Sequence, residues 1–200
     1  VFLAVLFVAT FLFPFDRKRR IAHSQGFWWA DAIIGLNPFW SFTIRGLEQI
    51  DHKKAYVVVV NHLSLADIVV LYKTRMQFKW VAKESLFKIP ILGWCLSGTK
   101  HIKLARGKYS SIKDAYQEAA AWLRQGVSVL FFPEGTRSTT EKMNNFKNGA
   151  FKLAIKEKKP ILPIRIEGSR NVIPRGSWIF KARTSCWLTV LPEIDTSAFA

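Results

Sequence analysis

Six short apolar runs, rich in valine and isoleucine, recur along the chain from residue 56 onward. Several of them are continuously apolar instead of alternating with polar residues, which is typical of strands that are covered on both faces. We therefore predict six β-strands. They span Tyr56–Val60, Phe78–Ala82, His101–Leu104, Val127–Phe132, Ile161–Ile166 and Cys186–Leu191.

Between the third and fourth of these runs the apolar residues repeat at helical spacing, from Ile112 to Leu123. This pattern predicts an amphipathic helix with one face on the core. Ser111 and Asp114 resemble a capping box at its start, and Gly126 suits a helix end, where glycine adopts a left-handed conformation without cost.

A second helix is expected from Asn148 to Glu157, where it stops before Pro160, and a further one begins near Asp67. Strands that alternate with helices are typical of one fold class. The sequence therefore predicts an α/β fold, in which a mostly parallel central sheet is flanked by helices.

The amino-terminal segment, residues 1 to 15, carries no charged side chain. Fifteen helical residues span about 22 Å, less than the ~30 Å hydrocarbon core of a bilayer. We expect the end of a spanning helix or a segment that dips into one leaflet, and a start at Val1 instead of Met indicates a missing upstream piece. The basic cluster Arg17–Arg20 predicts that the following domain lies on the cytoplasmic side of a membrane.

Residues 27 to 42, FWWADAIIGLNPFWSF, carry many aromatic side chains around a glycine and a proline. Such side chains favour the membrane interface, and the neighbouring apolar and basic segments support that interpretation. The alternative is a helix that packs on the core with ordinary aromatic residues. We favour the membrane, and expect a membrane-associated helical segment over residues 1–43 and an α/β domain over residues 44–200.

The composition indicates an anionic partner. The net charge is +16 and the isoelectric point is about 10.2. Between Lys73 and Lys113, ten lysines and arginines accompany one acidic residue, Glu84. Nucleic acid, anionic lipid headgroups and phosphorylated substrates all suit such a charge. Nucleic acid is disfavoured, because the aromatic residues are densest near the amino terminus instead of being interleaved with the basic stretch.

Cysteine and histidine show no metal-binding spacing. Cys95 and Cys186 are far apart and form no CxxC motif, and the four histidines are scattered. We expect two buried free thiols in a reducing compartment and no structural zinc or other metal.

A candidate acid–base pair lies in residues 61 to 67, NHLSLAD, where a strand ends and a helix begins. A carboxylate beside a histidine holds one tautomer and stabilises the imidazolium, so His62 and Asp67 are suited to general-base chemistry. Five residues on a straight helix turn about 500°, so the two side chains meet only if the backbone turns between them. Ser64 or Asp67 would supply that turn as a helix cap. The alternative is a solvent-facing histidine and a capping aspartate.

A second polar motif, FFPEGTRS, covers residues 131 to 138 and follows a predicted strand, where open α/β sheets bind ligands. Gly135 leaves room for a close ligand, and Thr136 and Arg137 offer donors suited to phosphate. Glu134 accepts hydrogen bonds only, from a hydroxyl or a neighbouring arginine. The alternative is a polar turn with a structural Glu–Arg pair.

Together these motifs resemble the glycerolipid acyltransferase family, in particular the 1-acylglycerol-3-phosphate acyltransferases. NHxxxxD is followed some seventy residues later by FPEGTRS, in the family's order and separation. Val81–Trp94, VAKESLFKIPILGW, is similar to the segment with a phosphate-binding lysine, here Lys83, and Ile161–Ser169, ILPIRIEGS, to the closing block. GTKHIKLAR departs from the family's Gly-x-x-Phe-Ile-x-Arg block, with two extra residues before Arg106 and Leu104 where Phe or Ile would stand.

The resemblance covers about residues 44 to 192 and implies acyl transfer from a thioester, acyl-CoA or acyl carrier protein, to a glycerol hydroxyl. It implies that His62 is the general base and that Asp67 orients it, without an acyl-enzyme, metal or further cofactor. It also implies that the acceptor phosphate is bound by basic residues and that the pocket is shaped by the FPEGTRS loop. These residues are Lys83, Arg106 and Arg137, with Glu134, Gly135 and Thr136 in the loop.

The expected activity is therefore acylation of lysophosphatidic acid to phosphatidic acid by an enzyme on the cytoplasmic face of a membrane, the bacterial inner membrane or an equivalent. Membrane lipids are then partners as well as substrates. Two alternatives stay open on the residues: the same chemistry on another lysophospholipid, glycerol 3-phosphate or an aminolipid, and a non-enzymatic basic membrane-binding protein.

Overall fold

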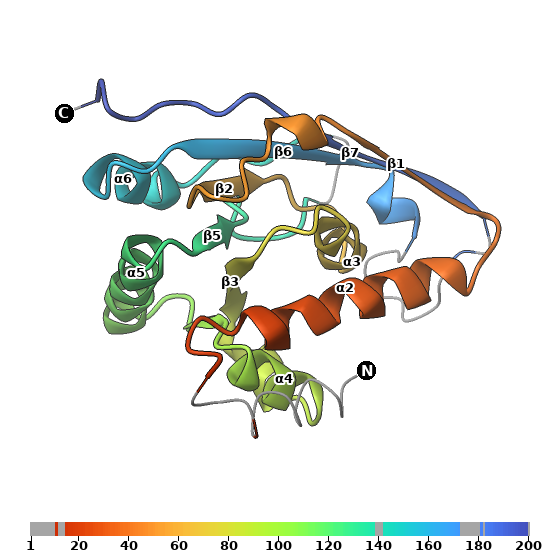
Figure 1. The fold of residues 1–200 in the computed structure, drawn as a ribbon, viewed down its shortest axis with the longest axis horizontal. Coiled ribbons are helices and arrows are strands. Elements are labelled where there is room, and N and C mark those ends of the chain that lie inside the picture. Colours follow the sequence, from red (N-terminus) through yellow and green to blue (C-terminus); the bar gives the residue numbers. More distant parts are fainter. Residues whose placement is uncertain (1–10, 12–14, 139–141, 173–180, 182, 200) are drawn as a thin grey trace.

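The computed structural model describes residues 11, 15–138, 142–172, 181 and 183–199. Within these residues, strands form a seven-stranded sheet in the order β1-β7-β6-β2-β5-β3-β4 (Figure 1). The strands are β1 (Trp40–Arg45), β2 (Val57–Val60), β3 (Phe78–Lys83), β4 (Ile102–Leu104), β5 (Ser128–Phe131), β6 (Ile161–Glu167) and β7 (Thr184–Val190).

Neighbouring strands run parallel except for β6 and β7, which pair antiparallel. The prediction of an α/β fold with a mostly parallel sheet is confirmed. All six predicted strands are present, with ends that differ by one or two residues. Because β2 to β6 are parallel along the sheet, their carboxyl ends lie at one edge, and the loops that follow them meet there.

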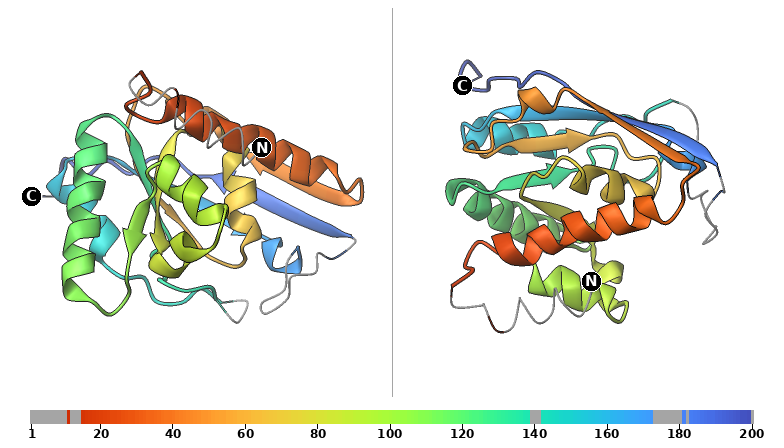
Figure 2. Two further views of the ribbon diagram at one scale, coloured as in Figure 1. Left: turned by 90° about the horizontal axis from the view of Figure 1, so that it is seen from below. Right: turned by 45° about the vertical axis from the view of Figure 1, so that its right-hand side comes forward.

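Helices cover both faces of the sheet (Figures 1 and 2). On one face lie α2, α3 and α4, and on the other lie α5 and α6. Short 3-10 turns occupy Leu47–Gln49, Glu84–Lys88 and Ser169–Asn171. The helices are α2 (Arg20–Gly35), α3 (Ala66–Tyr72), α4 (Leu92–Gly98), α5 (Tyr109–Arg124) and α6 (Gly149–Lys156).

The four valines of β2 explain why its sequence is continuously apolar. Val57 and Val59 belong to the core beneath α5 and α6, whereas Val58 and Val60 belong to the core beneath α2 and α3. Side chains alternate between the faces of a strand, so a strand covered on both faces needs apolar residues at every position.

Of the three predicted helices, the one near Asp67 is α3, and the ends of the other two differ in outcome. Residues Asn148 and Glu157 flank α6 as its caps, as expected. Helix α5 begins at Tyr109, before the expected capping box, and the Ser111 hydroxyl accepts a hydrogen bond from Ala105 N–H at 2.9 Å instead. The predicted capping box was therefore wrong, because a tertiary contact occupies the serine.

The end of α5 is confirmed at Gly126, which has φ +77°. Its N–H donates to the Leu123 carbonyl at 3.1 Å, and Val127 N–H donates to the Trp122 carbonyl at 3.0 Å. This pair of hydrogen bonds is the Schellman motif, which needs a left-handed residue where glycine stands.

The aromatic stretch from residue 27 to 42 is divided between the core and the surface. Phe27, Trp29 and Phe42 pack against the core. Trp28 and Phe39 are exposed by 71% and 59%. The packed-helix alternative thus holds for Phe27 and Trp29, which lie in α2, whereas Phe42 packs from a strand and the exposed aromatics stay available for the predicted interface. The described part of the chain contains no helix with both the length and the apolar character needed to cross a bilayer.

Strand β1 was not predicted. It spans Trp40–Arg45 and pairs in parallel with β7, from Trp40 opposite Thr184 to Arg45 opposite Thr189. The expected boundary between residues 43 and 44 falls inside this strand, so the sheet extends back into the aromatic stretch. The prediction for residues 1–15 concerns a segment that lies almost entirely outside the described residues.

Beneath α2 and α4, a cluster of titratable side chains is buried. The Nε2 atom of His23 accepts a hydrogen bond from Phe78 N–H at 3.4 Å, and Nδ1 of His101 accepts one from Trp80 N–H at 3.3 Å. Lys79 Nζ donates to the Thr99 carbonyl at 2.6 Å. Burial lowers the pKa of Lys79 to about 7. Burial, with the nearby Lys79 charge, lowers the pKa of His23 to about 3.

We expect these histidines to make the fold acid-sensitive. Below pH ~6.5 the unfolded chain binds protons at His23 that the folded chain does not bind until about pH 3, so stability falls as the pH falls through this window. At pH 5 the loss from His23 is about 2 kcal/mol. Urea unfolding at pH 7 and pH 5 measures it. His23→Gln should weaken the pH dependence while the exposed control His52→Gln leaves it unchanged, and an equal pH dependence in all three proteins would contradict the assignment.

Candidate active site

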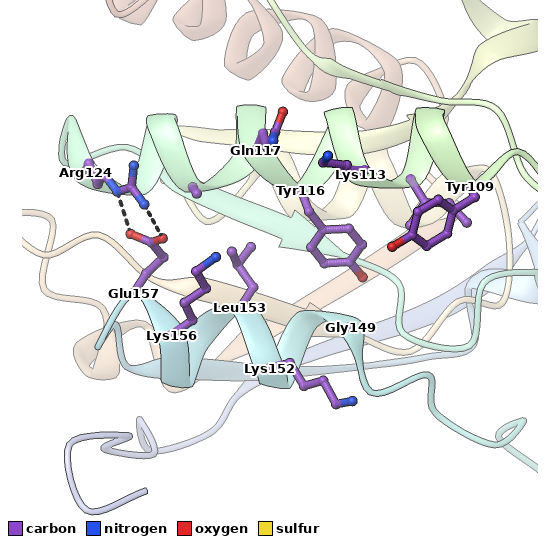
Figure 3. A pocket seen from close by; sticks show the side chains of 12 residues that line it. Tyr109, Lys113, Tyr116, Gln117, Arg124, Gly149, Lys152, Leu153, Lys156 and Glu157 are labelled. Carbon is purple, nitrogen blue, oxygen red and sulfur yellow. Dashed lines mark hydrogen bonds and ion pairs between the residues drawn. The ribbon is translucent and has the colours of Figure 1, made fainter. Parts of the chain in front are cut away.

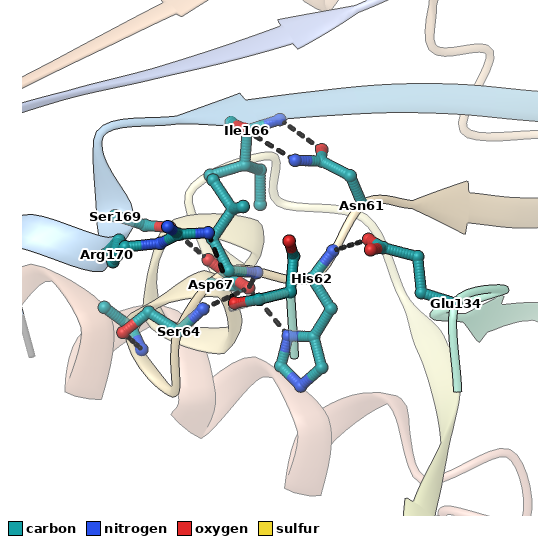
Figure 4. A network of polar contacts seen from close by, with 11 residues as sticks. Asn61, His62, Ser64, Asp67, Glu134, Ile166, Ser169 and Arg170 are labelled. Carbon is teal, nitrogen blue, oxygen red and sulfur yellow. Dashed lines mark hydrogen bonds and ion pairs between the residues drawn. The ribbon is translucent and has the colours of Figure 1, made fainter. Parts of the chain in front are cut away.

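The site lies at the carboxyl edge of the sheet, and Asn61 sets where β2 ends. Its side-chain amide pairs with the backbone of Ile166 in β6, as Figure 4 shows. Asn61 Nδ2 donates to the Ile166 carbonyl at 2.8 Å, and Ile166 N–H donates to Asn61 Oδ1 at 2.7 Å. The Asn61 side chain thus extends the pairing of β2 with β6 by one residue, and it positions His62 at the carboxyl edge of the sheet.

His62 and Asp67 are in direct contact. Nδ1 of His62 lies 2.7 Å from Oδ2 of Asp67, and the same oxygen accepts hydrogen bonds from the N–H groups of Leu63 and Ser64 at 2.8 and 3.0 Å. The backbone turns between the strand and α3, as the five-residue spacing required. Asp67 turns back over this loop from the first turn of α3, while the Ser64 hydroxyl accepts the Ala66 N–H at 3.3 Å.

The second oxygen of Asp67 accepts a hydrogen bond from the hydroxyl of Ser169, which follows β6. Both residues are fully buried. A buried carboxylate needs hydrogen bonds in place of water, and here four donors supply them. Cys186 lies close by, and burial together with the Asp67 charge raises the pKa of its thiol to about 12. Both cysteines are buried and neither forms a disulfide, as predicted.

The arrangement leaves one ring nitrogen of His62 facing outward. A carboxylate only accepts hydrogen bonds, so Nδ1 carries the proton and Nε2 keeps its lone pair. The ring stacks on Phe132, with centroids 4.0 Å apart and planes at 21°. The His62 side chain is 15% exposed, and it lines a cavity with Nε2 away from the polar network (Figure 4).

Glu134 holds the backbone of the site. Its Oε1 accepts the His62 N–H at 2.7 Å, and its Oε2 accepts the Asn144 N–H at 2.8 Å. Glu134 is buried and does not line the cavity. The structure thus places it behind His62, where it links the end of β2 to the loop at Asn144, instead of in a Glu–Arg pair.

A cavity of about 220 Å³ opens in front of His62. Lys83 at the end of β3 and Arg106 after β4 line it, as does Lys147 from the loop before α6. Gly135 also lines it, with φ +71°, and a Cβ there would lie 3.0 Å from Lys147 Nζ. The structure therefore brings four predicted residues, His62, Lys83, Arg106 and Gly135, to one cavity and adds a third cation.

Besides Glu134 and the buried Asp67, two further predicted residues, Thr136 and Arg137, do not line this cavity. Thr136 is exposed and Arg137 is half-buried. The chain at Arg137 nevertheless runs beside the dyad, because Ser138 N–H donates to the His62 carbonyl at 2.8 Å. Their predicted roles stay predictions.

A second cavity of about 300 Å³ lies between α2, α3 and α4. It is mostly apolar and shares its walls with the first: both are lined by Leu65, Ile68, Trp80 and Leu86. An apolar chain that starts near His62 would therefore find a lined path beneath α2.

Comparison with known proteins identifies the family. The family model described as Acyltransferase matches residues 41–167. The chain belongs to the acyltransferase family. Residues His62, Asp67 and the FPEGTRS loop all fall within the matched part, so the predicted resemblance is confirmed.

Among curated proteins, this acyltransferase is 38% identical to a 1-acyl-sn-glycerol-3-phosphate acyltransferase of Chlamydomonas reinhardtii, over 88% of this chain and 53% of that protein. It is 36% identical to the chloroplastic LPAT1 of Arabidopsis thaliana, over 88% of this chain and 50% of that protein. The chain thus spans about half the length of these relatives.

The fold also matches a solved structure. The crystal structure of the 1-acyl-sn-glycerophosphate (LPA) acyltransferase PlsC from Thermotoga maritima superposes with a TM-score of 0.82 at 30% identity. The alignment covers 98% of this chain and 78% of that one.

Several site residues of this acyltransferase were missed by reasoning from the sequence. Ser169 stands in the closing block, ILPIRIEGS, and Asn61 directly precedes His62, so both were within quoted motifs but had no assigned role. Lys147 carried no motif. Only the folded chain shows that Ser169 contacts Asp67, that Asn61 pairs with the backbone of Ile166 beside His62, and that Lys147 lines the cavity.

Proposed function

We propose that this acyltransferase moves a fatty acyl chain from a thioester, acyl-CoA or acyl carrier protein, to the free sn-2 hydroxyl of 1-acylglycerol 3-phosphate, giving phosphatidic acid. One observation carries the proposal: a histidine with a buried carboxylate partner faces a cavity that three cations surround. Two relatives named as 1-acyl-sn-glycerol-3-phosphate acyltransferases, which each align with 88% of this chain, support the proposal.

In the proposed reaction, His62 Nε2 takes the proton of the acceptor hydroxyl as its oxygen attacks the thioester carbonyl. The new C–O bond forms, the C–S bond breaks, and the proton on His62 passes to the leaving thiolate. Asp67 stabilises the imidazolium between these steps. Transfer is direct, because the thiols of Cys95 and Cys186 are buried and their pKa values are raised by desolvation.

The acceptor phosphate would bind the cations that line the cavity, Lys83, Arg106 and Lys147, and Arg137 on the neighbouring loop is a further candidate. Lys83→Ala and Arg106→Ala should each raise KM for lysophosphatidic acid while kcat changes little. A hydrogen bond to a charged group contributes about 1.5–3 kcal/mol, which corresponds to roughly a 10- to 100-fold rise. Steady-state kinetics measures it, with exposed Lys53→Ala as the control. An unchanged KM in both variants would show that the phosphate binds elsewhere.

We further propose that the enzyme works at the cytoplasmic face of a membrane, with the acyl chain in the apolar cavity beneath α2. The exposed Trp28 and Phe39 support this position. Exposing an acyl chain to water costs about 0.8 kcal/mol per CH₂, so moving a long lipid through water would cost on the order of 10 kcal/mol. An enzyme that lies on the bilayer avoids that cost.

Ser169→Ala should lower kcat by about tenfold, equivalent to about 1.4 kcal/mol, because Asp67 loses one of its donors. Ser169→Thr keeps a hydroxyl and should recover most of the rate. Ser128→Ala is the matched control, since this buried hydroxyl accepts the Tyr56 N–H far from the dyad. If Ser128→Ala lowered kcat equally, or Thr failed to restore it, Ser169 would have only a structural role.

The decisive experiment follows thiol release from acyl-CoA and from acyl carrier protein, with and without lysophosphatidic acid. Acceptor-dependent release is expected. A panel of other lysophospholipids, glycerol 3-phosphate and an aminolipid tests the alternative acceptors. If no acceptor in the panel stimulated thiol release, the result would favour the alternative of a non-enzymatic membrane-binding protein.

A further inference from the structure

A groove of about 620 Å³ lies between α5 and α6, on the face of the sheet opposite α2 (Figure 3). Its walls include the apolar side chains of Ala120 and Leu153. The far end is closed by Arg124, which pairs with Glu157 through two hydrogen bonds of 2.7 and 2.8 Å.

The groove adjoins the cavity in front of His62. Ile112 and Tyr116 line both. Tyr116 stacks on Phe131, another wall of the cavity, with centroids 5.8 Å apart. Figure 3 shows its ring pointing toward Gly149, where an added Cβ would lie 1.7 Å from the Tyr116 hydroxyl. Glycine at the start of α6 therefore makes room for the ring at the junction.

The groove is also cationic. Lys113, Lys152 and Lys156 line it, and no ion pair links them to a carboxylate within the described residues. The acidic residue of the lining, Glu157, is already neutralised by Arg124. Figure 3 shows Lys156 extending into the gap between the two helices. An apolar wall with a surplus of positive charge suits an extended ligand that ends in phosphate.

We propose that this groove binds the phosphopantetheine arm of the thioester donor, the chemistry that acyl-CoA and acyl carrier protein share. The inference rests on the proposed function. The thioester carbonyl must reach His62, and the arm behind it is long, uncharged along most of its length and phosphorylated at its end. The α5–α6 groove accepts the donor from one face of the sheet, while the lipid cavity opens beneath α2 on the other.

The test compares Lys113→Glu/Lys156→Glu with a control that changes the net charge equally at the opposite edge of the sheet, Arg45→Glu/Lys53→Glu. We expect the groove variant to raise KM for acyl-CoA at least tenfold, with kcat and KM for lysophosphatidic acid within twofold of wild type. The same rise is expected with acyl carrier protein if the wild type uses it. A short acyl thioester without phosphate should be used equally by wild type and variant.

Two further measurements keep the result interpretable. Gln117→Trp narrows the groove without a change in charge and should raise KM for every pantetheine-bearing donor. Calorimetry with CoA alone should show weaker binding to the charge-reversed variant, independently of turnover.

Unchanged KM for acyl-CoA and acyl carrier protein in both groove variants would overturn the inference, and so would a rise confined to lysophosphatidic acid. Wild-type protein that releases no thiol from either donor would instead overturn the proposed function, on which the groove assignment depends. The two failures are distinguishable, because the first appears only in the variants.

Discussion

His62→Ala is expected to lower kcat for acyl transfer by about 10³-fold while the protein stays folded. General-base catalysis contributes about 10²- to 10⁴-fold. Alanine removes the atom that faces the cavity but leaves the backbone hydrogen bonds at this position, from His62 N–H to Glu134 and from Ser138 N–H to the His62 carbonyl. The measurement is thiol release from the donor at saturating lysophosphatidic acid.

His52→Ala is the matched control, because this histidine is exposed on a turn at the opposite edge of the sheet. Thermal unfolding of both variants shows whether the fold survives. Acyl transfer at near the wild-type rate by folded His62→Ala would remove the proposed base.

Asp67→Asn should lower kcat by about 10²- to 10³-fold, no more than the loss of His62 itself, because it acts through the tautomer of His62. An amide that turns its NH₂ group toward the ring donates to Nδ1, so the proton moves to Nε2 and the base is lost at the cavity. Asparagine has nearly the same size as aspartate. With the NH₂ group toward the ring, its carbonyl oxygen can still accept the hydrogen bond from the Ser169 hydroxyl, whereas the Leu63 and Ser64 N–H groups lose their acceptor.

The double variant His62→Ala/Asp67→Asn sharpens this test. If Asp67 acts through His62, the double variant is no slower than His62→Ala alone, because the partner has nothing left to orient. Asp114→Asn, on the exposed face of α5, serves as the control. Additive losses in the double variant would show that Asp67 has a separate role.

The fold was largely predictable because its signals are local. Each of the strands β2 to β7 reads as an apolar run, and α6 is bounded by Asn148 and Glu157 as expected. Strand β1 was not predicted because its aromatic residues fit a membrane interface as well as a sheet edge. Pairing with β7, more than 140 residues later in the chain, decides between these two interpretations, and no local sequence pattern indicates that pairing.

The site was predictable in its residue types and less so in its contacts. His62, Lys83, Arg106 and Gly135 reach one cavity, whereas Glu134 holds backbone N–H groups behind it. The FPEGTRS motif does not show this difference, because a glutamate that binds a ligand and a glutamate that binds a loop backbone are the same residue type in a sequence. Only the direction of the side chain separates them.

The sequence by itself determined the alternation of strands and helices, the family and the two residues of the dyad, since these depend on short spacings. Only the tertiary structure decided the surroundings of the dyad. Ser169 contacts Asp67 across 102 positions of the chain, and Asn61 contacts Ile166 across 105. Contacts of that range exist because parallel strands bring distant loops to one edge of the sheet.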